Sequence, residues 1–274
     1  MITKGSYEDK FQPVKDAFEE LHSSGRETGS SFAVYQDGNA IIDLWGGYSD
    51  KEKNTIWEQD TLANVWSTTK GVAATCVALM VEKKLLDYDE KVTHYWPEFG
   101  LNGKEDITVG MLLSHQAGIC GTEDAEIEDY YNQKNMADRL SKMTPIWVPG
   151  SASGYHSMTY GWLAGELVLR VSGKSLGTIL REEITSKRDI DFHIGLDKSE
   201  HHRCAEMIPM PRKKRDPNEI IEITDAQKAT ALGPNTLKHQ NTAQWKEAEM
   251  PAANGQGSAQ GLAKFYSLVV PQDK

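Results

Sequence analysis

The most hydrophobic segment of the chain runs from Gly71 to Val81. Its side chains are apolar at nearly every position, and a helix without a polar face is normally buried in a protein core. We expect this helix to begin at Ser67 and to end near Lys83 and Lys84, where positive charge suits the carboxyl end of a helix dipole. The pattern therefore places the main core of the protein around this helix.

The N-terminal part of the chain predicts one helix and a β-hairpin. Apolar residues recur at helical spacing over residues 11–21. Residues 31–36 and 40–45 are rich in apolar and aromatic side chains and predict two strands. The residues that join them, 37–39, read Asp-Gly-Asn, which is typical of a tight hairpin turn.

The rest of the chain predicts mostly helices and loops. Residues 46–60 and 187–251 are polar and contain many turn-forming residues, and we expect little regular structure in the second of these segments. Elsewhere, hydrophobic spacing and capping residues predict further helices. These helices are Val109–His115 with Thr108 as its cap, Asp124–Lys142, Thr159–Val171 ended by Gly173, Leu176–Ile184, and Ala259–Val269 with Ser258 as its cap.

The composition is typical of a soluble globular protein, with 39% hydrophobic and 26% charged residues among 274. The formal net charge of -10 would repel nucleic acids and anionic membranes. No apolar segment is long enough to cross a bilayer, and residues 1–9 lack the pattern of a signal peptide. The widely spaced Cys76, Cys120 and Cys204 favour free thiols in a reducing compartment. We therefore expect a cytoplasmic protein with neither a nucleic-acid nor a membrane partner.

Ser67 and Lys70 form the first candidate for chemistry. On a helix these residues lie one turn apart on the same face, which brings a hydroxyl close to an amine. A serine nucleophile needs a nearby base, and an amine can be that base if burial or the positive end of a helix dipole lowers its pKa. The backbone N–H of Ser67 is a candidate donor to an oxyanion.

The same two residues also have a purely structural interpretation. Ser67 would then be the N-cap of the helix, and Lys70 a solvated lysine in its first turn. However, a lysine in the first turn opposes the helix dipole, and locally unfavourable residues are expected at functional sites. Taken alone, the tetrapeptide leaves both interpretations open.

Tyr155, His156 and Ser157 form the second candidate. The preceding residues 145–154 are rich in proline, glycine and serine and predict a rigid loop that ends at Tyr155, just before a helix. A phenol hydrogen-bonded to an ammonium group can act as a general base or relay a proton. The structural alternative is a core tyrosine with one satisfied hydroxyl.

Several blocks of the sequence together resemble the beta-lactamase-related serine hydrolases, in particular class C beta-lactamases, family VIII carboxylesterases and the animal beta-lactamase-like proteins. Ser-x-x-Lys is the acylation motif of the penicillin-recognising serine hydrolases. The blocks follow the order of the family and cover nearly the whole chain. They are Asn64–Gly71, Leu112–Gly118, Pro149-Gly150 leading to Tyr155–Gly161, and Asn254–Ala263.

The resemblance implies a role for each candidate residue. Ser67 would be the nucleophile that forms an acyl-enzyme, Lys70 would activate it, and Tyr155 would be the partner base and later the acid for the leaving group. Ser157 stands in a substrate-binding position where the lactamase pattern has an asparagine that helps to grip the amide side chain of beta-lactams. Esterase or peptidase-like activity is therefore expected rather than true beta-lactamase activity.

The resemblance also implies a fold class, α/β of the α+β type. A beta-lactamase/transpeptidase-like antiparallel sheet would be flanked by helices, with a helical subdomain over roughly residues 85–190 inserted in a single domain, 1–274. The family's later strand, with Lys-Thr-Gly or His-Thr-Gly and an oxyanion donor, has no match in this sequence. We therefore expect only the two N-terminal strands, a C-terminally truncated chain, and an incomplete sheet whose open edge favours homo-oligomers.

The resemblance thus implies a serine hydrolase that acts through an acyl-enzyme on a small-molecule ester or amide and needs no cofactor. A catalytically inactive scaffold is the alternative, because the terminal strand is missing. His201, His202 and Cys204 lack the spacing of a zinc site, so we expect no metal. We interpret the basic run 212–215 as solvated charge rather than a nuclear signal or anion patch, and His115 as a buried, hydrogen-bonded histidine.

Overall fold

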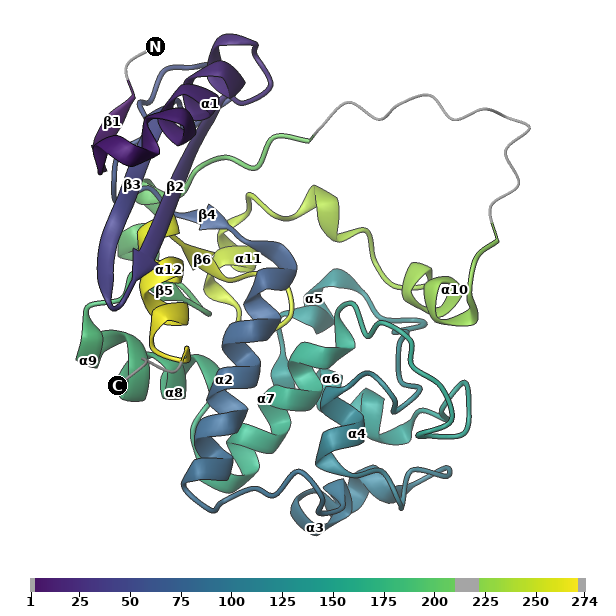
Figure 1. The fold of residues 1–274 in the computed structure, drawn as a ribbon. Helices are drawn as coiled ribbons and strands as arrows, with labels where there is room; N and C mark the ends of the chain where they lie inside the picture. The colour runs from purple at the N-terminus through teal and green to yellow at the C-terminus, as the bar shows by residue number, and fades with distance from the viewer. Residues whose placement is uncertain (1–2, 210–221, 271–274) are drawn as a thin grey trace.

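A computed structural model describes residues 3–209 and 222–270 of the chain. A small antiparallel sheet with the strand order β1-β3-β2 stands beside a larger group of helices (Figure 1). Its strands are β1 (Lys4–Tyr7), β2 (Gly29–Gln36) and β3 (Asn39–Gly47). The α-helices are α1 (Gln12–Ser23), α2 (Thr69–Glu82), α3 (Val92–Tyr95), α4 (Val109–Leu113), α5 (Ile127–Tyr130), α6 (Gln133–Lys142), α7 (Thr159–Ser172), α8 (Leu176–Ile179), α9 (Ser186–Arg188), α10 (Asp225–Ala231), α11 (Ala243–Glu247) and α12 (Ala259–Ser267).

The predicted hairpin is confirmed, and its turn explains why. Asp37 and Gly38, which join β2 to β3, have φ angles of 51° and 77°. Two consecutive residues with positive φ give a turn whose twist matches that of the flanking strands. Aspartate and glycine adopt this conformation more readily than most residues, so the local sequence alone encodes the turn.

The expectation of only two N-terminal strands is wrong, because β1 pairs with β3 on the side opposite β2. Its sequence, Lys-Gly-Ser-Tyr, has no hydrophobic alternation and therefore gave no strand signal. Gly5 is needed there, since a Cβ at this position would lie 1.9 Å from the Asp43 carbonyl oxygen. The backbone of β3 offers this strand hydrogen-bond partners, and Tyr7 at its end packs against the cluster of Phe18, Ile42 and Leu44.

Helices cover both faces of this sheet (Figure 1). On one face, Phe18 of α1 packs with the buried side chains of Ile42 and Leu44. On the other face, Gln260 of α12 donates a hydrogen bond of 3.1 Å to the buried carboxylate of Asp43. Successive residues of a strand point to opposite faces of the sheet. Because Ile42 and Leu44 contact α1 and Asp43 contacts α12, the two helices lie on opposite faces.

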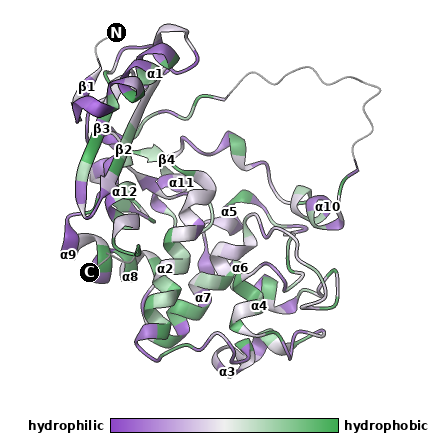
Figure 2. Cartoon of the chain, in the orientation of Figure 1, coloured by the Kyte–Doolittle hydropathy of each residue, from purple (hydrophilic) through white to green (hydrophobic). Residues whose placement is uncertain are grey.

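The main core forms around α2 and α7, which lie side by side (Figure 1). In Figure 2 most of α2 is coloured as hydrophobic. Val72, Cys76 and Val77 of α2 are fully buried, as are Leu163 and Leu167 of α7. The prediction of a buried helix after Ser67 is therefore confirmed.

Capping residues were predicted correctly where the signal is local. The hydroxyl of Thr108 accepts a hydrogen bond from the Met111 N–H at the start of α4, and that of Ser258 accepts one from the Gly261 N–H at the start of α12. Gly173, with a φ of 71°, ends α7 in the left-handed conformation that glycine adopts without strain.

Other predictions of helices were wrong in their extent. Residues 124–142 form two helices, α5 and α6, because the Asn132 side chain caps α6 by accepting a hydrogen bond from the Asn135 N–H. Beyond α8 the chain continues through a π-helical turn, Leu180–Thr185, into α9. Residues 187–251 contain more regular structure than expected: the part that the structure describes includes α10, α11 and the short strand β5 (Phe192–His193).

A second small sheet connects the N-terminal half of the chain to its C-terminal half. The strand β6 (Gln256–Gly257) lies in its middle and pairs antiparallel with β4 (Ala63–Asn64) and with β5. The strand β4 is followed directly by the 3₁₀ turn Trp66–Thr68 and by α2. This sheet therefore fixes the segment that carries Ser67.

Two further sequence predictions concern the extent of the chain's parts. The boundaries proposed for a helical subdomain, 85–190, stay a prediction, as does the incompleteness of the sheet. The basic run 212–215 lies outside the described residues. Within residues 3–209 and 222–270, no helix is both long enough and apolar enough to cross a lipid bilayer.

Candidate active site

Ser67 lies in the 3₁₀ turn Trp66–Thr68, two residues before α2 begins at Thr69. It is not the N-cap of α2: that position belongs to Thr68, whose side chain makes no capping hydrogen bond. Trp66 has a φ of 46°, in the left-handed region that a bulky residue rarely adopts. Its ring is held against the buried Trp245, with 5.6 Å between ring centroids. The turn is thus strained and supported, and it leaves the side chain of Ser67 exposed.

The amine of Lys70 contacts three oxygen atoms. Its Nζ lies 3.2 Å from Ser67 Oγ, 2.7 Å from the Ser157 carbonyl oxygen and 2.8 Å from the Ala252 carbonyl oxygen. A neutral amine has two N–H donors and one lone pair. If the two carbonyl groups accept both donors, the lone pair is left for the proton of Ser67. The three contacts therefore suit an amine that takes a proton from the serine hydroxyl.

Burial favours the neutral form of this amine. The Lys70 residue is 8% exposed, and its Nζ makes no hydrogen bond to a carboxylate of the residues that the structure describes. Desolvation by burial lowers the pKa of Lys70 from 10.5 to about 8. The solvated lysine of the structural interpretation is therefore not what the structure shows. At neutral pH, the Lys70 amine is therefore neutral in a part of the protein molecules, and in these molecules its lone pair is free.

Tyr155 completes the group around Ser67. Its Oη lies 2.6 Å from Ser67 Oγ, and Lys70 Nζ lies 4.9 Å from the centroid of its ring. The Tyr155 residue is 49% exposed, so it is not the core tyrosine of the structural alternative. The structure thus brings together the three side chains that the sequence singled out, from segments 88 residues apart.

Ser157, the predicted substrate-binding residue, contributes a backbone atom here. Its carbonyl oxygen accepts the hydrogen bond from Lys70, and the residue is partly exposed. A contact of its side chain with substrate stays a prediction. The Ala252 carbonyl oxygen is the other acceptor of a hydrogen bond from Lys70, and it could not be recognised from the sequence because Ala252 lies 182 residues away along the chain.

The buried segment 252–257 holds the start of α2 in place. The Gly255 carbonyl oxygen accepts a hydrogen bond from the Val65 N–H, and the Gly255 N–H donates one of 3.0 Å to Thr69 Oγ1. The amide oxygen of the buried Asn64 accepts hydrogen bonds from Gln256 Nε2 and Trp245 Nε1. Only the resemblance of residues 254–263 to a family block pointed to this segment, since its partners are distant in sequence.

We expect Thr69→Val to reduce the stability of this region. Thr69 is fully buried, and valine has nearly its shape but cannot accept the hydrogen bond from Gly255. An unpaired buried N–H costs about 1–3 kcal/mol. Urea unfolding should therefore show a loss of about 2 kcal/mol in the free energy of unfolding. The matched variant Thr68→Val, at an exposed neighbour, should change it by less than about 0.5 kcal/mol. Equal effects of the two changes would contradict this account.

Other candidates from the sequence do not form a site. In the part of the chain that the structure describes, no three or more His, Cys, Asp or Glu side chains gather as metal ligands would. His201 lies 3.8 Å from Glu247 instead. His115 is half-buried rather than buried, and its Nδ1 accepts a hydrogen bond from the His156 N–H.

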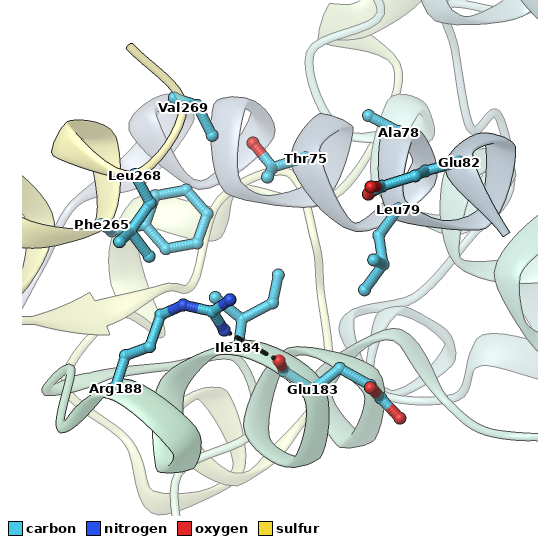
Figure 3. A pocket seen from close by; sticks show the side chains of 10 residues that line it. All are labelled: Thr75, Ala78, Leu79, Glu82, Glu183, Ile184, Arg188, Phe265, Leu268 and Val269. Atoms are coloured by element: carbon cyan, nitrogen blue, oxygen red, sulfur yellow. Dashed lines mark hydrogen bonds between the residues drawn. The ribbon is translucent and has the colours of Figure 1, made fainter. Parts of the chain in front are cut away.

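A cavity of about 260 Å³ lies further along α2 (Figure 3). Its walls come from α2, from the π-helical turn, from α9 and from the end of α12. The lining residues are Thr75, Ala78, Leu79, Glu82, Glu183, Ile184, Arg188, Phe265, Leu268 and Val269. Ser67, Lys70 and Tyr155 are not among them, so this cavity is separate from the candidate active site.

Comparison with known proteins identifies the family. The family model described as Beta-lactamase matches residues 14–274. Esterase/beta-lactamase LipL of Mycobacterium tuberculosis is 33% identical over 276 residues, which cover 97% of this chain and 64% of LipL. Penicillin-binding protein 4 of Amycolatopsis lactamdurans is 26% identical over 62% of this chain and 45% of its own length. The chain therefore spans less than two thirds of these curated relatives.

Solved structures agree with this result. The crystal structure of a family VIII carboxylesterase is 41% identical, with a TM-score of 0.90 over 98% of this chain and 72% of the other. A penicillin-binding protein homologue from Caulobacter crescentus is 38% identical, with a TM-score of 0.86 over 96% of this chain and 70% of the other. The fold is thus the α/β fold of beta-lactamases and transpeptidases. With this fold and a family match over almost its whole length, the chain belongs to the beta-lactamase family.

Proposed function

We propose that this chain is a serine hydrolase that cleaves small esters through an acyl-enzyme on Ser67. One observation carries the proposal: Ser67 Oγ lies within hydrogen-bond distance of both Lys70 Nζ and Tyr155 Oη. A nucleophile in contact with a base, itself held by further groups, is the arrangement that nucleophilic catalysis requires. No cofactor takes part in this scheme.

In the acylation step, Ser67 Oγ attacks the carbonyl carbon of the ester while its proton moves to the pair formed by Lys70 and Tyr155. The carbonyl oxygen gains the negative charge, and the backbone N–H of Ser67, near the positive end of α2, is our candidate donor to it. When the tetrahedral intermediate collapses, the bond to the leaving alkoxide breaks. Tyr155 gives that oxygen a proton and regains one from Lys70.

Deacylation uses the same groups with water in place of the alcohol. A water molecule loses a proton to the pair of Lys70 and Tyr155 and attacks the acyl carbon, and the proton then returns to Ser67 Oγ as the acid leaves. The exposure of Ser67 and Tyr155 is compatible with the entry of water. One proton is taken up and one released in each half of the cycle, so the enzyme is unchanged at its end.

Esters are favoured over beta-lactams for two reasons. Position 157 is a serine and lacks the side-chain amide that the lactamase pattern offers to an amide side chain. Among the similar proteins, the family VIII carboxylesterase, which is 41% identical with a TM-score of 0.90, is named as an esterase. Esters are favoured over peptide amides for a separate reason. An ester has a better leaving group than a peptide amide, so its departure depends less on protonation by Tyr155.

A fluorophosphonate probe tests the proposal directly. The probe forms a covalent bond with an activated serine, and mass spectrometry of the digested protein should find it on Ser67. In parallel, hydrolysis of a p-nitrophenyl ester should exceed hydrolysis of the beta-lactam nitrocefin. A well-folded sample that neither reacts with the probe nor hydrolyses the ester would favour the alternative function, a catalytically inactive scaffold.

The reaction should depend on pH through Lys70. Acylation needs the form of the site that has lost one proton, and burial lowers the pKa of Lys70 to about 8. The kcat/KM for a p-nitrophenyl ester should therefore rise about tenfold per pH unit between pH 6 and pH 8 and level off above pH 8. Stopped-flow acylation rates between pH 6 and pH 9.5 would measure this profile. A rate independent of pH over that range would exclude Lys70 as the titrating group.

A further inference from the structure

His115 is held in an unusual conformation beside the candidate active site. Its φ of 64° lies in the left-handed region, although it is not a glycine. It follows α4 at the point where the chain turns towards the loop before Tyr155. Such strain persists only where the surroundings hold it, and it often marks a functional position.

Two hydrogen bonds connect His115 to the residues on either side of Tyr155. Its carbonyl oxygen accepts a hydrogen bond of 3.0 Å from the Gly154 N–H. Its Nδ1 accepts a hydrogen bond of 3.1 Å from the His156 N–H. The backbone of Tyr155 is thus fixed from both ends by a single residue.

The ring of His115 also limits where the phenol can lie. Its centroid is 5.1 Å from that of Tyr155 and 5.3 Å from that of the buried Tyr160. Behind it, the buried ring of His156 accepts a hydrogen bond from the Ile119 N–H at Nε2 and contacts the Gly154 carbonyl oxygen at Nδ1. The segment that carries Tyr155 therefore has little freedom to shift.

We propose that His115 is a positioning residue that clamps residues 154–156 and so holds Tyr155 Oη against Ser67 Oγ. This inference rests on the proposed function of the Ser67 site. His115 makes no contact with Ser67 in this arrangement, and it acts only through Tyr155. A displacement of about 1 Å at a catalytic group can reduce a rate by about 10²-fold, so the clamp has a measurable effect on acylation.

The clamp requires an unprotonated Nδ1, because a protonated nitrogen cannot accept the hydrogen bond from His156. The groups that face the ring are Lys70, Tyr155, His156 and Tyr160. Burial, and then the positive charge of Lys70, lower the pKa of His115 and so favour its neutral form. Strong acid should protonate the ring and release the clamp.

Two substitutions test the hydrogen-bond acceptor of His115 and its ring separately. His115→Asn places an amide oxygen close to the position of Nδ1, and asparagine tolerates a positive φ. His115→Phe keeps a ring but has no acceptor. With a p-nitrophenyl ester, kcat/KM should fall about 10- to 100-fold in His115→Phe and stay within about threefold of the original chain in His115→Asn. The same change at the exposed His94, His94→Phe, is the matched control and should have no effect.

The slope of the pH profile gives a second readout. In acid, log kcat/KM of the original chain should fall with a slope steeper than one over the one to two pH units in which His115 gains a proton, because Lys70 and His115 are then both being protonated. The His115→Asn variant should keep a slope of one, since its acceptor does not titrate. Equal slopes for the original chain and His115→Asn would overturn the inference. Equal rates for His115→Phe and the original chain would also overturn it, and so would a rate for His115→Asn as low as that of His115→Phe.

Hydrogen–deuterium exchange tests the clamp without any activity. The His156 amide should exchange about tenfold faster in His115→Phe than in the original chain or in His115→Asn, because its acceptor is lost. Unchanged exchange would overturn the clamp. If the original chain shows this protection but no reaction with the fluorophosphonate probe, the proposed function fails while the clamp stands. If His115→Phe does not fold, His115→Asn and the original chain still give the comparison of pH slopes.

Discussion

Ser67→Ala should abolish covalent labelling by a fluorophosphonate and reduce the hydrolysis of a p-nitrophenyl ester by about 10⁴- to 10⁶-fold. The hydroxyl of Ser67 is the exposed group that both Lys70 Nζ and Tyr155 Oη contact. Its removal leaves the two proton-transfer groups with nothing to activate. Labelling can be followed by intact-protein mass spectrometry, and hydrolysis by the absorbance of p-nitrophenolate.

The neighbouring hydroxyl provides the control for this experiment. Thr68 is exposed, and its side chain makes no capping hydrogen bond, so Thr68→Val should be labelled at the original rate. Both variants should keep the melting temperature within about 2 °C, because both changes are at exposed residues. If Ser67→Ala is labelled as fast as the original chain, the attack starts from another residue and the proposed mechanism is wrong.

Lys70→Met should reduce the rate of acylation by about 10³- to 10⁵-fold while Ser67 remains in place. The methionine side chain has a similar length but contains no amine that could take the proton of the serine. It also leaves the carbonyl groups of Ser157 and Ala252 without their donor. Some loss of stability is therefore expected as well, and the melting temperature must be measured beside the rate. Lys134→Met, at a highly exposed lysine of α6, is the matched control.

Lys70→Arg distinguishes a base from a fixed positive charge. A guanidinium group stays protonated in proteins, so it can hold charge but cannot accept a proton. If Lys70 is the base, the arginine variant should be as slow as Lys70→Met and should lose the rise in rate towards pH 8. A variant that keeps most of the activity would show that only the charge matters, and Tyr155 would then be the base.

The substitutions at Ser67 and Lys70 differ from those at Thr69 and His115 in the function that they remove. Ser67 and Lys70 exchange protons in every proposed step, so their loss removes the reaction itself. Thr69 and His115 support the positions of other atoms, so their loss should leave a slower or less stable protein. If the substitutions at Thr69 and His115 reduced the rate more than those at Ser67 and Lys70, the rate would depend more on the residues that hold the site in place than on the proposed proton transfers.

Local sequence determined much of the fold. The Asp-Gly turn after β2 needs two positive φ angles, which these residue types adopt at low cost. The apolar run of α2 has only one stable environment, the core, whatever surrounds it. Thr108, Gly173 and Ser258 act on backbone groups within a few residues of themselves, so their effects are visible in a short window of sequence.

The candidate nucleophile and its two partners were also recognisable from the sequence, although for different reasons. Ser67 and Lys70 are three residues apart, so any helical turn brings them together. Tyr155 is 88 residues away, and only the resemblance to a family placed it near them. Periodicity and composition carry no information about such a distant pair.

Only the tertiary structure decided the environment that makes these groups reactive. The carbonyl groups of Ser157 and Ala252 reach Lys70 from 87 and 182 residues away, and burial by the surrounding chain lowers the pKa of that amine. The strained turns at Trp66 and His115 likewise exist because distant residues hold them, and β1 forms because β3 has an edge to offer. The physical reason is common to all of them: a short segment encodes its own backbone preferences, but desolvation and long-range hydrogen bonds depend on which segments the whole fold brings together.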